Sequence, residues 1–133
     1  MTRTRVAVLR GGPSEEYEVS MQTGKGVLEA LSKKNIYTVD VVINKQGGWL
    51  VHGFERPPQS ILSVIDVVFI ALHGSYGEDG TVQRLLDRLG IPYTGSRAYP
   101  SSVALNKLLT KEQLRNVGIK MAPHLKIRRE GTN

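Results

Sequence analysis

The sequence contains no cysteine, which excludes disulfide scaffolds, cysteine–zinc sites and thiol nucleophiles. Aromatic residues make up only 6% of the chain and do not alternate with basic residues, which argues against a stacking surface for single-stranded nucleic acid. No apolar run approaches membrane-spanning length, and residues 1–5 lead directly into an apolar strand rather than into the apolar stretch of a signal peptide. We therefore expect a cytoplasmic protein that binds neither membrane nor nucleic acid.

The size and charge of the chain leave its partners open. With 133 residues, 40% of them hydrophobic, the chain is long enough to form one domain with its own core. The net charge of +6 permits attraction to phosphates, but a merely basic surface is the alternative, because most of the charges are scattered. Lys126, Arg128 and Arg129 form the one dense basic cluster in the sequence.

Residues 67–72 are six consecutive apolar residues, a pattern typical of a strand that is buried on both faces. We expect this strand at the centre of a parallel sheet. A glycine-rich polar loop follows, from His73 to Gly80, and then an apolar stripe of helical spacing: Val82, Leu85, Leu86 and Leu89. Ligands of open α/β sheets bind at the carboxyl ends of strands, so this loop is a candidate binding site.

A second strand-to-helix turn lies near the amino terminus. Residues 5–9 read as a buried strand, Gly11 and Gly12 allow a tight turn, and Ser14 is a candidate cap for a helix that continues to about residue 34. Gly24 and Gly26 each destabilise such a helix by about 1 kcal/mol relative to alanine. We therefore expect that another part of the chain, or a ligand, packs closely there.

The remaining pattern predicts an α/β fold, namely a three-layer, open, mostly parallel sheet with helices on both faces, as in Rossmann-like domains. Further elements are expected as strands over 37–43 and 49–54, a short strand after Gly90, helices over 101–107 and 110–118, and a last strand over 124–127. That last strand has no evident partner in the sequence. The glycines lack the G-x-G-x-x-G spacing of a dinucleotide site.

Four segments resemble the motifs of D-alanine–D-alanine ligases, in the order in which that family has them. They are 11–20, 69–83, 90–96, and Lys107-Leu108 with Thr110-Lys111, Gly118 and Pro123. The resemblance covers almost the whole chain. It implies a pre-ATP-grasp N-terminal domain over 1–120, and a linker and first strand over 121–133 that lead toward a missing ATP-grasp domain.

The resemblance also implies a chemistry for the complete enzyme. Such ligases use ATP and Mg²⁺ to convert the carboxylate of one D-alanine to an acyl phosphate, which the amine of a second D-alanine attacks, and the dipeptide enters peptidoglycan. Because the later motifs have no counterpart here, we expect this chain alone to hold neither cofactor and to be inactive, as a truncated form or a short product of the gene. The implied partners are D-alanine, the missing ATP-grasp domains and a second copy in a homodimer.

The residues implied by the resemblance fall on both turns. Glu16 and His73 take catalytic roles, Val19, Ser20 and Gly74 join them in contacting substrate, Lys107 lies near the nucleotide phosphates, and no metal ligand is expected. Tyr17 and Asn106 depart from the family, which often has arginine and usually has aspartate at these positions.

Each of these residues also has a plainer interpretation. Glu16 could complement a helix dipole, and His73 could bond loop backbone at the end of a strand. Asp79 fits a helix cap better than a catalytic acid, Ser20 could bond near the first helical turn, and Lys107 could be a solvated lysine. Two other functions stay open at this point: a stand-alone module that binds a small ligand, and a domain for self-association.

Overall fold

The computed structural model describes residues 3–127 and contains a five-stranded sheet in the order β4-β3-β2-β1-β5. The three longest strands run parallel: β1 (Arg5–Gly11), β2 (Tyr37–Ile43) and β5 (Val67–Ile70). The short strands β3 (Trp49–Val51) and β4 (Phe54–Glu55) add an antiparallel extension beside β2. The helices are α1 (Tyr17–Ser32), α2 (Pro58–Leu62), α3 (Thr81–Leu89), α4 (Ala98–Leu105) and α5 (Lys107–Leu114).

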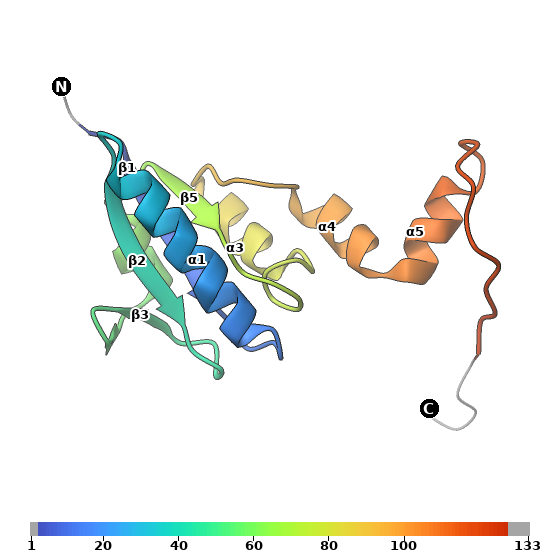
Figure 1. Cartoon of the computed structure of the whole chain (residues 1–133), viewed down its shortest axis with the longest axis horizontal. Helices are drawn as coiled ribbons and strands as arrows, with labels where there is room; N and C mark the ends of the chain where they lie inside the picture. Colours follow the sequence, from blue (N-terminus) through green and yellow to red (C-terminus); the bar gives the residue numbers. More distant parts are fainter. Residues whose placement is uncertain (1–2, 128–133) are drawn as a thin grey trace.

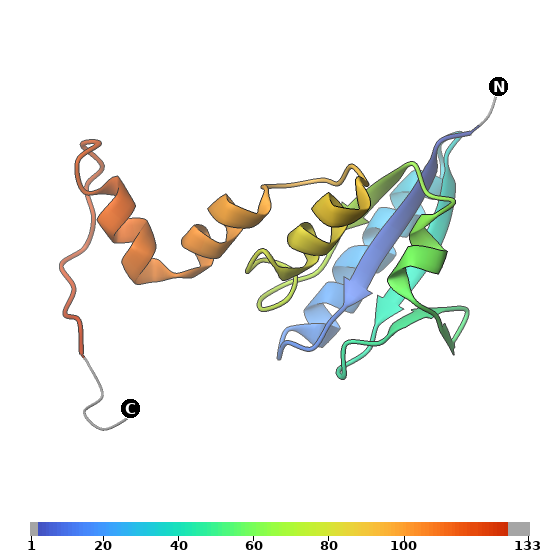
Figure 2. The ribbon, with the colours of Figure 1, turned by 180° about the vertical axis from the view of Figure 1, so that it is seen from behind.

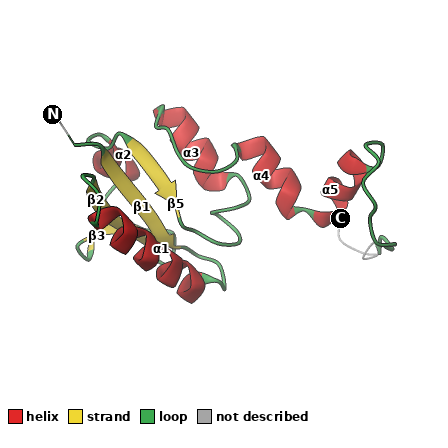
Figure 3. Cartoon of the chain, turned by 45° about the horizontal axis from the view of Figure 1, so that its top comes forward, coloured by secondary structure: helices red, strands yellow, loops and turns green. Residues whose placement is uncertain are grey.

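Helices cover both faces of the sheet, as expected (Figures 1 and 2). One face packs Val6, Val8 and Ala71 against the apolar side of α1, while α2 and α3 close the other face over a larger core that includes Leu9, Val68 and Leu86. Figure 3 shows the same three layers from above, with α1 and α2 on opposite sides of β1. The predicted open α/β sheet with helices on both faces is thus confirmed.

The expectation that the strand over 67–72 is central was wrong, because β5 is the last strand of the sheet and β1 lies in the middle of the three parallel strands. Its outer edge is nevertheless occupied: the N–H of Val68 donates to the carbonyl of Pro92, and the N–H of Thr94 donates to the carbonyl of Val68. An apolar run indicates that both faces of a strand are covered, but it does not indicate whether other strands lie on both of its edges. The short strand expected after Gly90 is reduced to this single bridge at Tyr93.

The last two helices extend away from the sheet (Figure 1). They begin earlier than predicted, because Asn106 ends α4 and its Oδ1 accepts the N–H groups of Leu108 and Leu109 as the cap of α5. The helix predicted from Thr110 therefore starts one turn sooner. Thr110 therefore does not cap the helix. Its hydroxyl donates to the backbone carbonyl of Val103, at 2.7 Å.

The strand predicted over 124–127 is not formed, since residues 121–127 have no regular secondary structure. A strand needs a neighbour to take up its backbone hydrogen bonds, and none lies beside this segment in the part of the chain that the structure describes. Arg128 and Arg129 of the predicted basic cluster lie outside the described residues. Among residues 3–127, no helix is both long and apolar enough to cross a membrane.

Candidate functional site

The loops that follow β1 and β5 meet at one edge of the sheet. Because the two strands are parallel neighbours, their carboxyl ends lie side by side, and each chain then turns toward a helix. The hydroxyl of Ser14 joins the loops: it donates to the carbonyl of His73 at 2.7 Å and accepts the N–H of Glu16 at 3.2 Å. Ser14 therefore connects the two predicted motifs instead of capping α1, which begins after Glu16.

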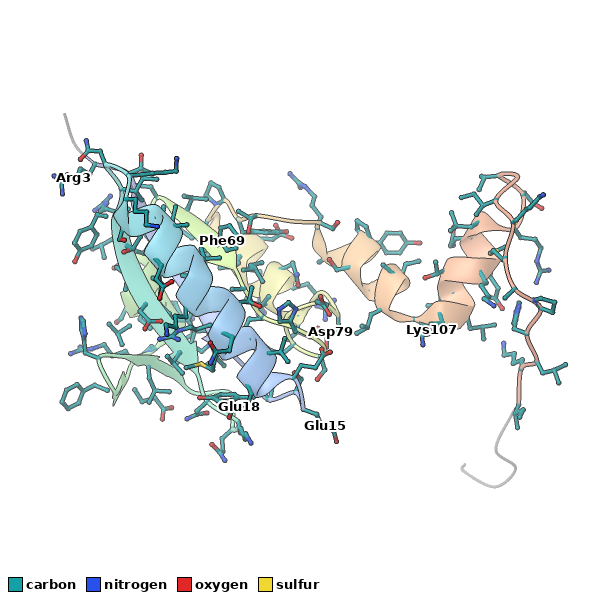
Figure 4. All side chains as sticks on the ribbon, viewed as in Figure 1. Arg3, Glu15, Glu18, Phe69, Asp79 and Lys107 are labelled. Carbon is teal, nitrogen blue, oxygen red and sulfur yellow. The ribbon has the colours of Figure 1, made fainter. Side chains whose placement is uncertain are left out.

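Gly74 brings the second loop against the carboxylate of Glu16. Its φ of +70° is in the left-handed region, and a Cβ built on it would lie 2.8 Å from Oε2 of Glu16. The N–H of Gly74 donates to Oε2 of Glu78 at 2.8 Å. Two carboxylates thus flank one glycine, and Figure 4 shows further acidic side chains at this end of the molecule, with Glu15 and Glu18 at the start of α1 and Asp79 in the facing loop.

His73 stands half-buried beside this glycine with contacts at both ring nitrogens. Its Nε2 lies 2.8 Å from the hydroxyl oxygen of Thr23 on α1, and its Nδ1 lies 3.8 Å from Oε1 of Glu78. The side chain of Thr23 also donates to the carbonyl of Val19 at 3.1 Å. The plainer interpretation of His73 as a loop-bonding histidine is therefore replaced by contacts with side chains of α1 and of its own loop.

Ser20 fixes the first helix to both strands. It is completely buried; its hydroxyl accepts the N–H of Gly11 and donates to the carbonyl of Ala71, each at 2.8 Å. Both hydrogen-bonding capacities of this hydroxyl are used within the protein, so its place in the site is to hold the two loops at their separation. Val19, in contrast, is 59% exposed at the open rim.

The loop from His73 to Gly80 is ordered by Asp79. Its carboxylate accepts the N–H groups of Tyr76 at 2.9 Å and Thr81 at 2.8 Å. Asp79 therefore bonds the first residue of α3, although Gly80 and not Asp79 occupies the N-cap position. Burial acts to raise the pKa of Asp79, but these hydrogen bonds and the charge of Arg84 outweigh it, so the net pKa is lowered. Asp79 therefore remains ionised and structural.

Tyr76 anchors the same loop to the hairpin. Its φ is +73°, and its hydroxyl accepts the indole N–H of the buried Trp49 at 2.9 Å. Burial raises the pKa of the Tyr76 hydroxyl, although the bond from Trp49 opposes that shift.

Lys107 is not brought to this site. It is exposed at the first residue of α5, and Figure 4 shows it well apart from Glu15, Glu18 and Asp79. A cavity of about 440 Å³ lies on the other side of the loop, between Glu78 and Gln83 on one wall and Ser101 and Leu105 of α4 on the other. Neither Glu16 nor His73 lines that cavity; Glu16 is exposed and His73 half-buried at the rim formed by the two loops.

The donor set does not fit a metal-bound nucleotide. Over residues 3–127 no three or more histidine, aspartate or glutamate side chains group in a way that could hold a metal ion. Lys107 is exposed at the start of α5 and has no glycine-rich loop beside it in the chain, so it does not by itself make a triphosphate site. We therefore assign ATP and Mg²⁺ to no residue set among residues 3–127.

Two residues of the site, Thr23 and Glu78, are not among the predicted site residues. A usable signal was present, because Thr23 follows Glu16 by seven positions, two helical turns, and so shares its face. Glu78 had no such signal, since its contact depends on the fold of an eight-residue loop.

Comparison with known proteins identifies the fold and its motifs. The family pattern described as D-ala D-ala ligase N-terminus matches residues 5–61 and 53–96, more than half of the chain. The chain belongs to this ligase family. A D-alanine–D-alanine ligase of Geobacter sulfurreducens is 43% identical over 129 residues, which are 97% of this chain and 38% of that protein. The resemblance noted in the sequence is confirmed.

Solved structures of the family agree with the fold. The D-alanine–D-alanine ligase of Aeromonas hydrophila superposes with a TM-score of 0.85 at 28% identity, covering 98% of this chain and 52% of that chain. The D-alanyl-alanine synthetase A of Vibrio cholerae gives a TM-score of 0.78 at 25% identity, covering 94% and 40%. This member of the ligase family thus spans roughly two fifths to a half of the relatives it matches.

The two departures from the family pattern have structural roles in this ligase-family chain. The ring of Tyr17 packs over Gly11, where a Cβ would lie 2.8 Å from Cε2, and Lys45 Nζ lies 5.5 Å from the ring centroid. Asn106 caps α5, a position at which asparagine and aspartate are equally effective.

Proposed function

We propose that this chain is the N-terminal, D-alanine-binding part of an ATP-dependent D-alanine–D-alanine ligase that makes D-alanyl-D-alanine for peptidoglycan. The observation that carries the proposal is the carboxylate of Glu16 against Gly74, at the rim shared by the loops after β1 and β5. Membership of the ligase family supports the reaction, and the relatives' names supply the substrate.

The rim is suited to the ammonium end of a small amino acid. Glu16 is exposed and forms no ion pair with another described residue. Its carboxylate can therefore accept charge-assisted hydrogen bonds from an ammonium group. His73 and Gly74 form the adjacent wall, Val19 offers an apolar surface for a methyl group, and Ser20 acts from beneath by holding both loops.

The open rim explains why we assign only half of a reaction to this chain. An acyl phosphate must be shielded from water, and an exposed rim does not shield it. In the complete ligase, ATP and Mg²⁺ supply the phosphoryl group that activates the first carboxylate. We propose that the part of the longer protein that this chain does not span holds them, with Lys107 directed toward it.

The wider organisation follows from the same proposal. Residues 1–120 form the pre-ATP-grasp domain, and 121–133 lead toward the ATP-grasp part. The complete enzyme is a cytoplasmic homodimer with D-alanine as its substrate. Alone, the chain is inactive, and phosphate release from ATP by the purified chain with Mg²⁺ and D-alanine would contradict that statement.

The binding role is tested by titrating ¹⁵N-labelled chain with D-alanine and following amide shifts by NMR. We expect weak binding that shifts the amides of Gly74 and Thr23, because both lie against the residues that face the ligand. Glu16→Gln removes the charge and should abolish these shifts. Glu15→Gln, a matched loss of an exposed carboxylate one residue earlier, should retain them, and ATP should produce none at this rim.

Two results would count against the proposal. One is that Glu16→Gln and Glu15→Gln weaken the D-alanine shifts equally, which would reduce Glu16 to a contribution to overall charge. The other is that D-alanine shifts residues around the cavity between Gln83 and Ser101 instead. That pattern would move the site to the far side of the loop.

A further inference from the structure

Thr23 on α1 contacts the ring of His73 and the backbone of its own helix. The hydroxyl group of threonine has one proton to donate and lone pairs to accept with. The oxygen of Thr23 has two neighbours at hydrogen-bonding distance, the carbonyl of Val19 at 3.1 Å and Nε2 of His73 at 2.8 Å. The carbonyl can only accept, so a bond to it uses the single proton of Thr23.

Because Thr23 has only one proton to donate, the two contacts favour one tautomer of the neutral imidazole. If the Thr23 proton goes to Val19, Nε2 of His73 must carry the proton of the second bond, and both contacts are then hydrogen bonds. In the opposite tautomer, Thr23 donates to Nε2, and its contact with Val19 has no proton between two oxygens. The first arrangement makes two bonds and the second makes one, so the first is the more stable.

We propose that Thr23 is a positioning residue that holds neutral His73 as the Nε2–H tautomer and turns its Nδ1 lone pair toward the loop. Nδ1 lies on the side of Glu78, 3.8 Å from Oε1, while Oε2 of Glu78 is bonded by Gly74 N–H. The distance of 3.8 Å is too long for a direct bond between these groups and leaves Nδ1 free to accept one.

The consequence for recognition rests on the proposed function. With Nε2 occupied by Thr23, the free edge of His73 is an acceptor, as are the carboxylates of Glu16 and Glu78 on either side of Gly74. Three acceptors around one glycine select a donor, so His73 faces the ammonium group of the ligand and not its carboxylate. Thr23 supplies this selectivity without touching the ligand.

The test is a long-range ¹H–¹⁵N correlation spectrum of the histidine rings in the labelled 133-residue chain, at a pH where the imidazoles are neutral. His73 is assigned against His52 and His124 by His52→Gln and His124→Gln variants. We expect a protonated Nε2 and an unprotonated Nδ1 in the parent chain. A dominant Nδ1–H form in the parent chain would overturn the proposal without any further variant.

Two substitutions separate positioning from packing. Thr23→Val keeps the shape but removes the hydroxyl, and it should release the ring, increasing the Nδ1–H fraction and weakening the contacts between the ring protons and position 23. Thr23→Ser keeps the hydroxyl and should retain the parent tautomer. A Thr23→Val spectrum with the parent tautomer ratio and ring contacts would refute the role of Thr23.

The measurement uses no D-alanine, so it stands or falls separately from the binding proposal. If the tautomer depends on Thr23 but D-alanine does not shift Gly74, the positioning role holds and the ligand assignment fails. If Thr23→Val does not fold, the parent spectrum and Thr23→Ser still decide the matter, because a serine variant with an altered tautomer would contradict the hydroxyl count.

Discussion

Gly74 lies where the loop after β5 meets the loop after β1, and its backbone and its lack of a side chain can be tested separately. Gly74 and Gly53 both have positive φ, +70° and +80°, but nothing lies within 4 Å of a Cβ built on Gly53. On Gly74 the same atom would meet Glu16 Oε2 at 2.8 Å and Ser14 at 3.2 Å. The two glycines are therefore matched controls for each other.

We expect Gly53→Ala and Gly74→Ala to lower the free energy of unfolding by similar amounts, about 1–2 kcal/mol, because a left-handed conformation costs about that much for alanine. The added clash at Gly74 is inexpensive, since the far end of a glutamate side chain can move away. That movement should change the NMR signals of Glu16 and Ser14 and abolish the D-alanine shifts in Gly74→Ala only. Urea unfolding followed by Trp49 fluorescence gives the energies, and unchanged Glu16 signals would contradict the contact.

For single residues, the sequence predicted which ones come together where their positions follow from the ends of strands. Glu16, His73 and Gly74 come together because parallel neighbours β1 and β5 end at one edge. Ser14 was misread as a cap, because its bond to the carbonyl of His73 spans 59 positions and leaves no local pattern. Glu78 was missed for the related reason that a loop fold decides its contact.

Helix α1 contains two glycines that the sequence marks as equally unfavourable, but the structure gives a packing reason for only one. A Cβ on Gly24 would lie 2.6 Å from both Cβ and Cδ of Arg10, whereas a Cβ on Gly26 would meet nothing within 4 Å. Arg10 cannot yield easily, because its guanidinium pairs with Asp40 and bonds the carbonyl of Met21. Gly24 is the close approach of α1 to β1 that the sequence led us to expect.

The two glycines should therefore respond to alanine with opposite signs. Gly26→Ala should raise the free energy of unfolding by up to about 1 kcal/mol through helix propensity alone. Gly24→Ala gains the same propensity but overpacks the helix against β1, and should lower stability by about 1–3 kcal/mol overall. Urea unfolding of both variants decides this, and stabilisation by both would mean that Arg10 moves aside freely.

Arg5, the first residue of β1, forms an ion pair with Asp66, the residue before β5, and this pair should affect the stability of the sheet in acid. Arg5 donates to Asp66 through its side chain and its backbone N–H, and these bonds lower the pKa of Asp66 to about 2. A carboxylate with a lowered folded-state pKa stabilises the protein above its unfolded pKa, near 3.8. That contribution is lost as the pH falls from the unfolded value toward the folded one.

Asp66→Asn removes this titration and leaves the other carboxylates in place. We expect the difference in urea midpoint between parent and Asp66→Asn to be constant from about pH 7 to about pH 5 and to shrink steadily toward about pH 2. The effect should be small and should weaken in salt, because both partners are partly exposed. A difference that grows on acidification would have the wrong sign for a lowered pKa.

For the whole molecule, the sequence predicted the arrangement of layers. The features that it did not predict depend on neighbours distant in the sequence. The apolar runs and helical stripes gave the sheet with helices on both faces. They could not place β5 at the end of the sheet, since its outer edge is satisfied by residues 92–94 rather than by a strand. They also suggested a strand over 124–127, where strand-forming residues have no partner within the described chain.

The sheet and the extended α4–α5 arm should differ in stability because only the first contains a core. Leu86 of α3 is completely buried, whereas Leu109 of α5 is 41% exposed and α5 has no buried residue. Leu86→Ala should lower the free energy of unfolding by about 2–5 kcal/mol. The same change at Leu109 should alter it by no more than about 0.5 kcal/mol.

Hydrogen exchange should report the same division without any substitution. Amides of β1, such as those of Val8 and Leu9, should exchange only by global unfolding, whereas amides of α5 should exchange through local opening and far faster. Protection of α5 equal to that of β1 would contradict an arm without a core. Repeating the measurement at tenfold dilution would then show whether the protection of α5 comes from self-association. Protection of Leu109 and its neighbours by a second copy falls with concentration, whereas protection within one chain does not.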